Sequence, residues 1–138
     1  PSNHRSQWIQ TSSNKILADA YNANPVSMAL SLENFDTVNG PRKCLILGDM
    51  LELGAGSRRE HLKIVDRVEK MNTDEIFWVG PLFTEAVRER NAAGMCFPHV
   101  DALISHLEKE PMQEFVILIK GSNGIRLTKL IASGVLGK

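Results

Sequence analysis

Short runs of apolar residues alternate along the chain with segments in which apolar residues recur every three or four positions. The clearest runs span residues 15–19, 43–48, 75–80 and 115–121, with a shorter one at 95–97. Continuous apolar character is typical of strands that are covered on both faces. Helical spacing between the runs includes Met28 to Phe35, Leu62 to Val68, Leu103 to Leu107 and Ile125 to Ile131. The alternation predicts an α/β fold, with a mostly parallel sheet and helices on both faces.

Two of the predicted helices carry recognisable start signals. Asn24 precedes Pro25, and because proline suits the first turn of a helix, Asn24 is predicted to be the N-cap. Ser57 and Glu60 have the spacing of a capping box, in which each side chain satisfies a backbone donor of the other. The sequence therefore predicts helices that begin close to Pro25 and Ser57.

Three of the turns that follow predicted strands contain more polar side chains than a tight connection needs. In a parallel sheet these turns emerge at one edge, where open α/β sheets bind ligands. This edge would collect Asp19, Asn22, Asn24, Asp49, Glu52, Lys120 and Ser122. Free N–H groups at the helix start near Pro25 favour a phosphate or carboxylate. The sequence thus predicts a ligand crevice formed by these three turns.

Several residues of this crevice have a structural interpretation beside the functional one. Asn24 is favoured as a helix cap over a ligand group. Asp19 fits a carboxylate that accepts from ribose hydroxyls, and equally a solvated aspartate that opens a turn. Lys120 ends an apolar strand, where an ammonium group usually meets an anion. The alternatives for Asp19 stay open at this point.

The segment GDMLELG has the same ambiguity. Gly48 and Gly54 are interpreted as turn positions with positive φ, and Asp49 and Glu52 as either ligand groups or solvated side chains. His61 lies beside the apolar face of the following helix, so a packed or helix-surface histidine is favoured over a catalytic one.

Composition narrows the class of protein further. The chain has 138 residues, 43% of them hydrophobic, which suffices for one compact domain without disulfides. Sixteen basic and sixteen acidic residues balance, so no net charge attracts nucleic acid or an anionic membrane. Cys44 and Cys96 lie among apolar residues and are expected to be free core thiols. No apolar run has the length of a membrane span, and a cytoplasmic location is expected.

Residues 1–14 are polar apart from Trp8 and Ile9 and are interpreted as a linker or edge segment from a preceding domain, with the domain itself at 15–138. No G-x-x-x-x-G-K-[ST] loop and no G-x-G-x-x-G motif occurs, and no His/Cys cluster has metal-ligand spacing. The domain is therefore not expected to hold a nucleoside triphosphate in those standard ways, and no metal ligands are predicted.

Three motifs, DAYNANPVSM at 19–28, LGDMLELG at 47–54 followed by His61, and KGS at 120–122, resemble the carboxy-terminal domain of the Mur ligases over essentially the whole chain. The resemblance implies a Rossmann-like domain, the third of a cytoplasmic, monomeric enzyme of peptidoglycan precursor synthesis. In the branch that it most resembles, ATP activates UDP-N-acetylmuramoyl-tripeptide for attack by D-alanyl-D-alanine. The N-terminal and central domains would be its partners, and the central domain would hold the phosphate loop and most of the Mg²⁺ ligands.

The resemblance also implies roles for individual residues. Cofactor contacts would come from Arg5, Asp19, Tyr21, Asn22 and Asn24, and dipeptide contacts from Asp49, Lys120 and Ser122. Asp19 would bind the ribose, and Asn22 and Arg5 would approach the phosphates as the catalytic pair. The chain departs from the family pattern after KGS, where Asn123 replaces the usual arginine and Leu127–Thr128 the usual Met-Glu pair. The alternative function is a free-standing, non-catalytic α/β module that binds a nucleotide or a small anion.

Overall fold

The structure is a computed structural model that describes residues 6–20 and 22–138. Arg5 and Tyr21 lie outside the described residues, so their predicted roles stay predictions. The strands are β1 (Gln7–Gln10), β2 (Lys15–Asp19), β3 (Arg42–Gly48), β4 (Glu75–Val79), β5 (Met95–Phe97) and β6 (Phe115–Lys120). The α-helices are α1 (Pro25–Asp36), α2 (Ser57–Glu69), α3 (Pro81–Arg90), α4 (Val100–Lys109) and α5 (Thr128–Ala132). Two short 3₁₀ turns, Gly54–Gly56 and Asn123–Ile125, precede α2 and α5.

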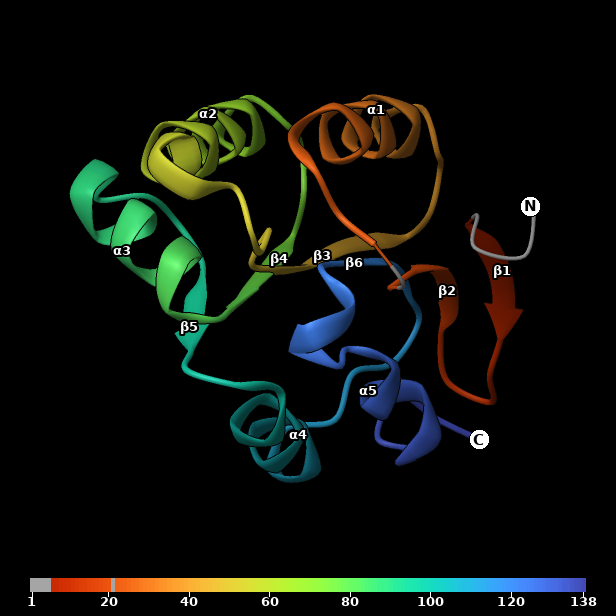
Figure 1. The fold of residues 1–138 in the computed structure, drawn as a ribbon. Coiled ribbons are helices and arrows are strands. Elements are labelled where there is room, and N and C mark those ends of the chain that lie inside the picture. Colours follow the sequence, from red (N-terminus) through yellow and green to blue (C-terminus); the bar gives the residue numbers. More distant parts are fainter. Residues whose placement is uncertain (1–5, 21) are drawn as a thin grey trace.

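The six strands form one sheet in the order β1-β2-β6-β3-β4-β5 (Figure 1). All neighbouring pairs are parallel except β1 with β2, which is antiparallel. The predicted α/β, mostly parallel sheet is therefore confirmed. The last strand, β6, inserts between β2 and β3, so the turns after β2 and β6 lie side by side at the carboxyl edge.

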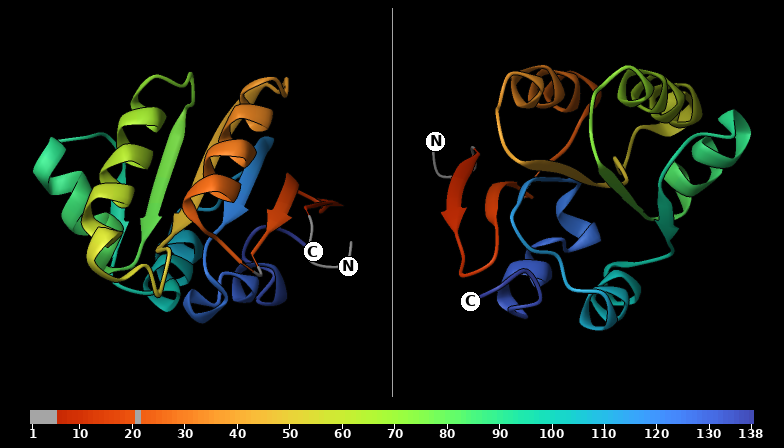
Figure 2. Two further views of the ribbon diagram at one scale, coloured as in Figure 1. Left: turned by 45° about the horizontal axis from the view of Figure 1, so that its top comes forward. Right: turned by 180° about the vertical axis from the view of Figure 1, so that it is seen from behind.

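Helices cover both faces of the sheet, as predicted (Figure 2). On one face α1, α2 and α3 pack a core that includes Phe35, Val65 and Phe83 against the sheet residues Leu45 and Trp78. On the other face α4 and α5 contribute Leu103, Leu107 and Leu130 to a second core. Continuous apolar strands are needed because both faces of the sheet are buried.

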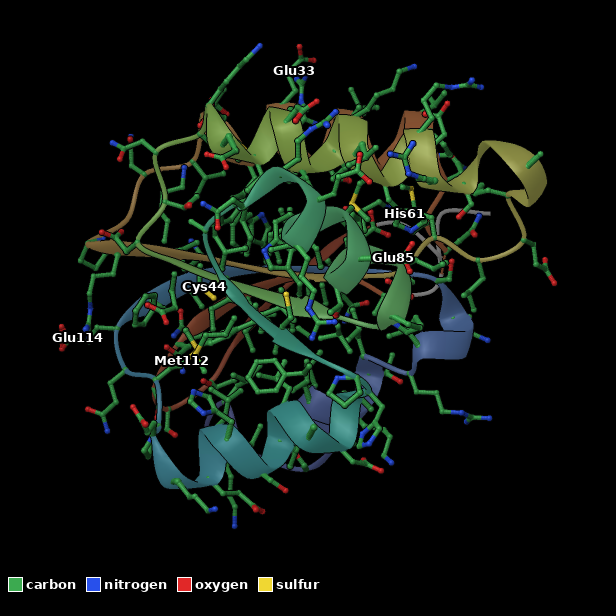
Figure 3. All side chains as sticks on the ribbon, turned by 90° about the vertical axis from the view of Figure 1, so that its left-hand side faces the viewer. Glu33, Cys44, His61, Glu85, Met112 and Glu114 are labelled. Atoms are coloured by element: carbon green, nitrogen blue, oxygen red, sulfur yellow. The ribbon has the colours of Figure 1, made fainter. Side chains whose placement is uncertain are left out.

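Both cysteines are free, as expected, with Cys44 buried and Cys96 partly buried. Figure 3 shows Cys44 inside the protein, whereas Glu33 and Glu114 project outward. Burial raises the pKa of both thiols, most strongly that of Cys44. In the part of the chain that the structure describes, no helix has the combined length and apolar character required to cross a bilayer.

One helix was not predicted, and two local predictions are wrong. Helix α3 was not expected between residues 80 and 95. The helix expected over Ile125–Ile131 begins only at Thr128, because a 3₁₀ turn and a left-handed Arg126 precede it. The Ser57–Glu60 capping box does not form, since Gly56 is the N-cap of α2 and has no side chain to offer.

Candidate functional site

The carboxyl ends of β2 and β6 bring two opposite charges together. The parallel register aligns Asp19 with Lys120. The Lys120 Nζ lies 2.7 Å from Asp19 Oδ2, and the two side chains are only 2% and 11% exposed. The same ammonium donates to the backbone oxygen of Asn22 at 3.2 Å. One buried cation therefore holds both the strand end and the turn that follows it.

The Asp19 carboxylate has further partners. Its Oδ2 atom also accepts from Ser6 Oγ at 3.2 Å and from Ser31 Oγ at 3.3 Å. Among the described residues all of these donors meet the same oxygen, and none donates to Oδ1. The interpretation of Asp19 as a freely solvated turn residue is therefore wrong, because the residue is 8% exposed and anchored by a lysine.

An open groove of about 400 Å³ lies beside this pair. It is lined by Ser6, Asp19, Asn22, Ser27, Leu30, Ser31, Asn34 and Lys120. Hydroxyls, amides and one carboxylate dominate this lining, and the first turn of α1 contributes to it. Such a surface can accept from and donate to sugar hydroxyls, and the helix start favours an anion.

The start of α1 is capped as predicted. Asn24 Oδ1 accepts from the backbone N of Ser27 at 2.9 Å, and Ser27 Oγ accepts from the backbone N of Asn24 at 3.1 Å. This is a complete capping box with Pro25 in the first turn. The predicted cap is confirmed, and the predicted cofactor contact of Asn24 remains a prediction.

The turn after β3 places its aspartate quite differently. Asp49 is fully buried, and its two carboxylate oxygens accept from the backbone N of Leu82 at 2.9 Å and of Phe83 at 2.8 Å. Burial raises the pKa of this carboxyl, and the hydrogen bonds from Phe83 and Leu82 offset part of the effect. Asp49 is thus the cap of α3, and its interpretation as a solvated residue is wrong.

A glycine makes this distant cap possible. Gly80 has a φ of +116°, and a Cβ there would lie 2.3 Å from Asp49 Oδ2. By contrast Gly48, predicted to have a positive φ, ends β3 in an extended conformation and allows close approach, since an added Cβ would lie 2.9 Å from Ile125 Cγ2. The positive φ predicted for Gly54 is confirmed at +67°.

His61 is a packed histidine, as favoured from the sequence. It has no exposed surface, and its Nε2 accepts from the backbone N of Met50 at 3.0 Å. Its Nδ1 lies 2.8 Å from the carbonyl oxygen of Ser57, and its ring meets Phe83 edge-on at 4.6 Å. These contacts connect the turn after β3 to α2 and α3.

Ser122 joins the three polar turns. Its Oγ accepts from the backbone N of Leu51 at 2.8 Å and lies 3.5 Å from the carbonyl oxygen of Ala23. Its backbone N donates to the carbonyl oxygen of Asp49 at 3.1 Å. The prediction that these turns share one edge is confirmed.

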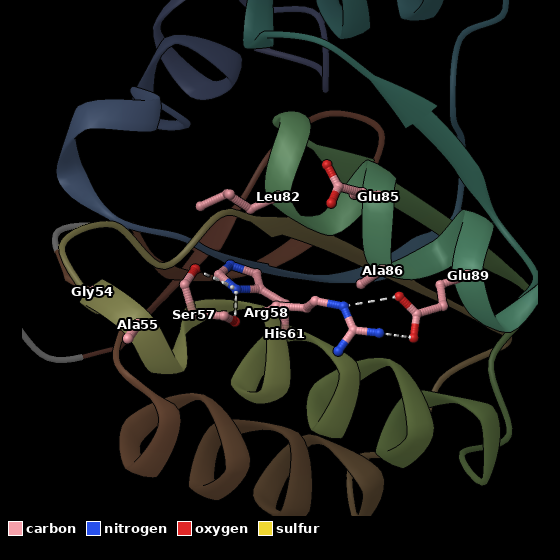
Figure 4. A pocket seen from close by; sticks show the side chains of 9 residues that line it. All are labelled: Gly54, Ala55, Ser57, Arg58, His61, Leu82, Glu85, Ala86 and Glu89. Atoms are coloured by element: carbon pink, nitrogen blue, oxygen red, sulfur yellow. Dashed lines mark hydrogen bonds and ion pairs between the residues drawn. The ribbon is translucent and has the colours of Figure 1, made fainter.

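A second pocket, which the sequence did not indicate, lies between the start of α2 and α3 (Figure 4). It has a volume of about 250 Å³ and is lined by Gly54, Ala55, Ser57, Arg58, His61, Leu82, Glu85, Ala86 and Glu89. Arg58 forms an ion pair with Glu89 at its rim. The helix signals of α3, which are Pro81 and the spacing of Phe83, Ala86 and Val87, could have placed Glu85 and Glu89 on one helix, but the position of that helix beside Arg58 depends on the tertiary fold.

The residues predicted to bind the dipeptide share one property. Asp49, Lys120 and Ser122 are 0%, 2% and 8% exposed, and each bonds to another part of the protein. Exposed polar side chains on the segments after β3 and β6 include Glu52, Asn123 and Arg126, and the turn after β2 adds Asn22 and Asn24. Within residues 6–20 and 22–138, no three or more His, Cys, Asp or Glu side chains gather where they could hold a metal ion.

Fold and groove together define a Rossmann-like α/β domain with an open polar groove at the carboxyl edge of its sheet. The family model described as Mur ligase, glutamate ligase domain, matches residues 4–123. The chain belongs to the Mur ligase family, which confirms the resemblance carried by its motifs.

Individual relatives agree with this assignment. The UDP-N-acetylmuramoyl-tripeptide–D-alanyl-D-alanine ligase of Rickettsia prowazekii is 32% identical over 92% of this chain and 29% of its own length. The enzyme of the same name from Escherichia coli is 31% identical over 89% of this chain and 27% of its own. The chain therefore spans less than a third of the length of these curated relatives.

Solved structures share the fold. A crystal structure of MurF from Acinetobacter baumannii superposes with a TM-score of 0.79 at 26% identity, covering 98% of this chain and 30% of that one. MurF from Thermotoga maritima, solved in complex with ADP, gives a TM-score of 0.75 at 20% identity, covering 96% of this chain and 30% of that one.

Proposed function

We propose that this chain is the carboxy-terminal domain of an ATP-dependent ligase that joins D-alanyl-D-alanine to UDP-N-acetylmuramoyl-tripeptide. The observation that carries the proposal is the polar groove at the start of α1, because it lies on the turn that holds the family motif DAYNANP. The names of the relatives supply the reaction, and their length supports a role as one domain of a longer enzyme.

The described residues of the groove have the chemistry to contact the ribose and the phosphates of a nucleotide. Asp19 can accept from ribose hydroxyls, and Asn22 at the start of α1 can approach phosphate oxygens. Arg5 and Tyr21 are proposed to add to the same site. The described residues offer no cluster of ligands for Mg²⁺, so the metal is assigned mainly to the central domain. ATP would supply the phosphoryl group that activates the carboxylate, while this domain closes over the nucleotide.

The acceptor side of the site is proposed to follow the turns after β3 and β6. Asp49 and Ser122 shape these turns from inside, since both are buried and bonded to neighbouring backbone. Contacts with the dipeptide are therefore assigned to the exposed Glu52 and Asn123 of the same turns. Glu52 has an exposed side chain and a left-handed backbone conformation, with a φ of +64°.

The reaction is tested by comparing two proteins. The full-length ligase that contains this domain should release phosphate from ATP only when Mg²⁺, the tripeptide nucleotide and the dipeptide are all present. The 138-residue chain should release none, because it lacks a phosphate loop. Turnover by the 138-residue chain would contradict the proposed division of the site. A full-length protein without dipeptide-dependent turnover would contradict the reaction itself.

The nucleotide groove is tested through the ribose. In the full-length ligase, Asp19→Asn should weaken ATP binding by roughly 10- to 100-fold, because a charge-assisted hydrogen bond is lost. The comparison of ATP with 2′-deoxy-ATP identifies the contact, since the variant should discriminate between them less than the wild type. Equal discrimination in both proteins would remove Asp19 from the ribose.

A further inference from the structure

Lys120 is a buried cation whose described contacts are all internal. Its side chain is 2% exposed, and its ammonium lies 2.7 Å from Asp19 Oδ2 and 3.2 Å from the carbonyl oxygen of Asn22. Both acceptors belong to the strand end and turn at the nucleotide groove, and Asn22 is 98 residues away along the chain. The lysine therefore couples β6 to a turn at the opposite end of the sequence.

The cost of burying charge limits what this ammonium can do. A buried cation is tolerated when it is paired and hydrogen-bonded, and removal of one partner leaves the other uncompensated. If Lys120 turned to a substrate anion, the carboxylate of Asp19 would lose its only lysine or arginine partner within 4 Å among the described residues. A state in which Lys120 stays paired with Asp19 is thus more favourable than one in which Lys120 leaves Asp19 to bind a substrate anion.

We propose that Lys120 is a positioning residue of the nucleotide site and touches no substrate. Its ammonium occupies Oδ2 of Asp19 and the carbonyl of Asn22, which orients the carboxylate and the Asn22 side chain toward the groove. This inference rests on the proposed function, in which the groove receives the nucleotide. It replaces the expectation from the sequence that Lys120 pairs with the carboxylate of the dipeptide.

Kinetics of the full-length ligase separate the possible roles. The variants are Lys120→Met, Asp19→Asn, the double variant, and Lys129→Met as a matched control. Lys129 pairs with Asp101 between α4 and α5, away from the groove, so the control removes the same group from an exposed pair.

We expect Lys120→Met to raise the KM for ATP by about 10-fold or more, from the loss of charged hydrogen bonds. The KM for the dipeptide should stay within about twofold of the wild type, a change too small to indicate a lost hydrogen bond. In the double variant, Lys120→Met should raise the KM for ATP by a smaller factor than it does alone, because part of its effect runs through Asp19 and only the part through Asn22 remains. The control should leave both KM values unchanged.

Two kinetic results would overturn the inference. A selective rise in the KM for the dipeptide would assign Lys120 to the acceptor substrate. Fully multiplicative effects of the two substitutions on the KM for ATP would indicate a direct and independent contact of Lys120 with the nucleotide, for example with a phosphate.

A labelling experiment on the 138-residue chain tests the geometry even if Lys120→Met fails to fold. Brief treatment with acetic anhydride, followed by mass spectrometry, should modify the exposed Lys129 and Lys63 much faster than Lys120. Asp19→Asn should increase the rate at Lys120. Equal rates at Lys120 and Lys129 in the wild type would overturn the inference. This result is independent of ligation, so a ligase without activity would contradict the proposed function alone.

Discussion

Asp19 and Asp49 lie at comparable places in the sheet and have different surroundings. Asp19 is the last residue of β2 and Asp49 follows the last residue of β3, and each opens a turn that leads to a helix. Asp19 meets an ammonium from the neighbouring strand and lines an open groove, whereas Asp49 is fully buried against the backbone N–H groups of α3. Comparable positions therefore border an open groove in one case and cap a helix in the other, and the neighbouring element decides which.

Replacing Asp19 should produce the larger loss of stability. Asp19→Ala leaves the Lys120 ammonium buried without its carboxylate, which costs about 3–5 kcal/mol in unfolding free energy. Urea denaturation of the 138-residue chain at pH 7 measures this loss. The double variant Asp19→Ala/Lys120→Met removes both charges and should recover part of it. A double variant less stable than Asp19→Ala would contradict the ion-pair explanation.

The same substitution at Asp49 should cost about 2–3 kcal/mol, since it removes a cap and leaves two backbone donors of α3 without an acceptor. Asp49→Asn keeps one oxygen and should cost less than Asp49→Ala. Hydrogen exchange at Leu82 and Phe83, which donate to Asp49, should accelerate in both variants. Unchanged protection at these amides would show that Asp49 does not cap the helix.

A smaller loss of stability is expected at α1, whose capping residue is exposed and directly precedes the helix. Asn24→Ala should cost about 1 kcal/mol, because it removes the capping box of α1. Ser57→Ala is the control, since Ser57 does not cap α2 and its long 3.3 Å contact with His61 Nδ1 duplicates the 2.8 Å contact of that nitrogen with the Ser57 carbonyl oxygen; it should change stability by less than about 0.5 kcal/mol. Thermal unfolding of both variants measures the difference, and equal losses would contradict the assigned caps.

The smallest effect concerns pH. The raised pKa of Asp49 means that the folded chain holds this proton more tightly than the unfolded chain does. Its contribution to stability is therefore complete below the unfolded pKa and is lost as the pH rises through the folded pKa. The unfolding free energy of the wild type minus that of Asp49→Asn should fall as the pH rises from about 4, the unfolded pKa of an aspartate. A difference that grows with pH would show that the shift has the opposite sign.

Much of the fold could be predicted because burial on both faces of the sheet leaves a strong apolar signal in the sequence. The strands β2 and β5 match their predicted bounds, and β3, β4 and β6 differ by single residues. Helix α3 was not predicted although Pro81 in its first turn and the spacing of Phe83, Ala86 and Val87 are local helix signals, while its side-chain cap, Asp49, is far away in the sequence. The capping box at Ser57 failed because the 3₁₀ turn before it makes Gly56 the N-cap of α2.

The location of the candidate site, at the carboxyl edge of the sheet, could be predicted from the sequence. The roles of its individual residues could be predicted less well. The rule that parallel strands present their turns together located the three turns correctly. The pairing of Asp19 with Lys120 depends on β6 inserting next to β2, and local patterns contain no information on strand order. For the same reason the sequence offered Asp49, Lys120 and Ser122 as exposed ligand groups, although their partners lie on distant elements that bury them.

Gly48, the last residue of β3, and Gly121, which follows β6, affect how this edge of the sheet can move. An added Cβ at Gly121 would lie 2.9 Å from the Cα of Gly48, so the two strand ends touch backbone to backbone. Ser122 then fastens both strand ends to the turns on either side. Because no side chain separates the two strand ends, the turns that follow them are expected to move as one rigid unit. A displacement of the turn after β2 is therefore expected to move the turn after β3 with it.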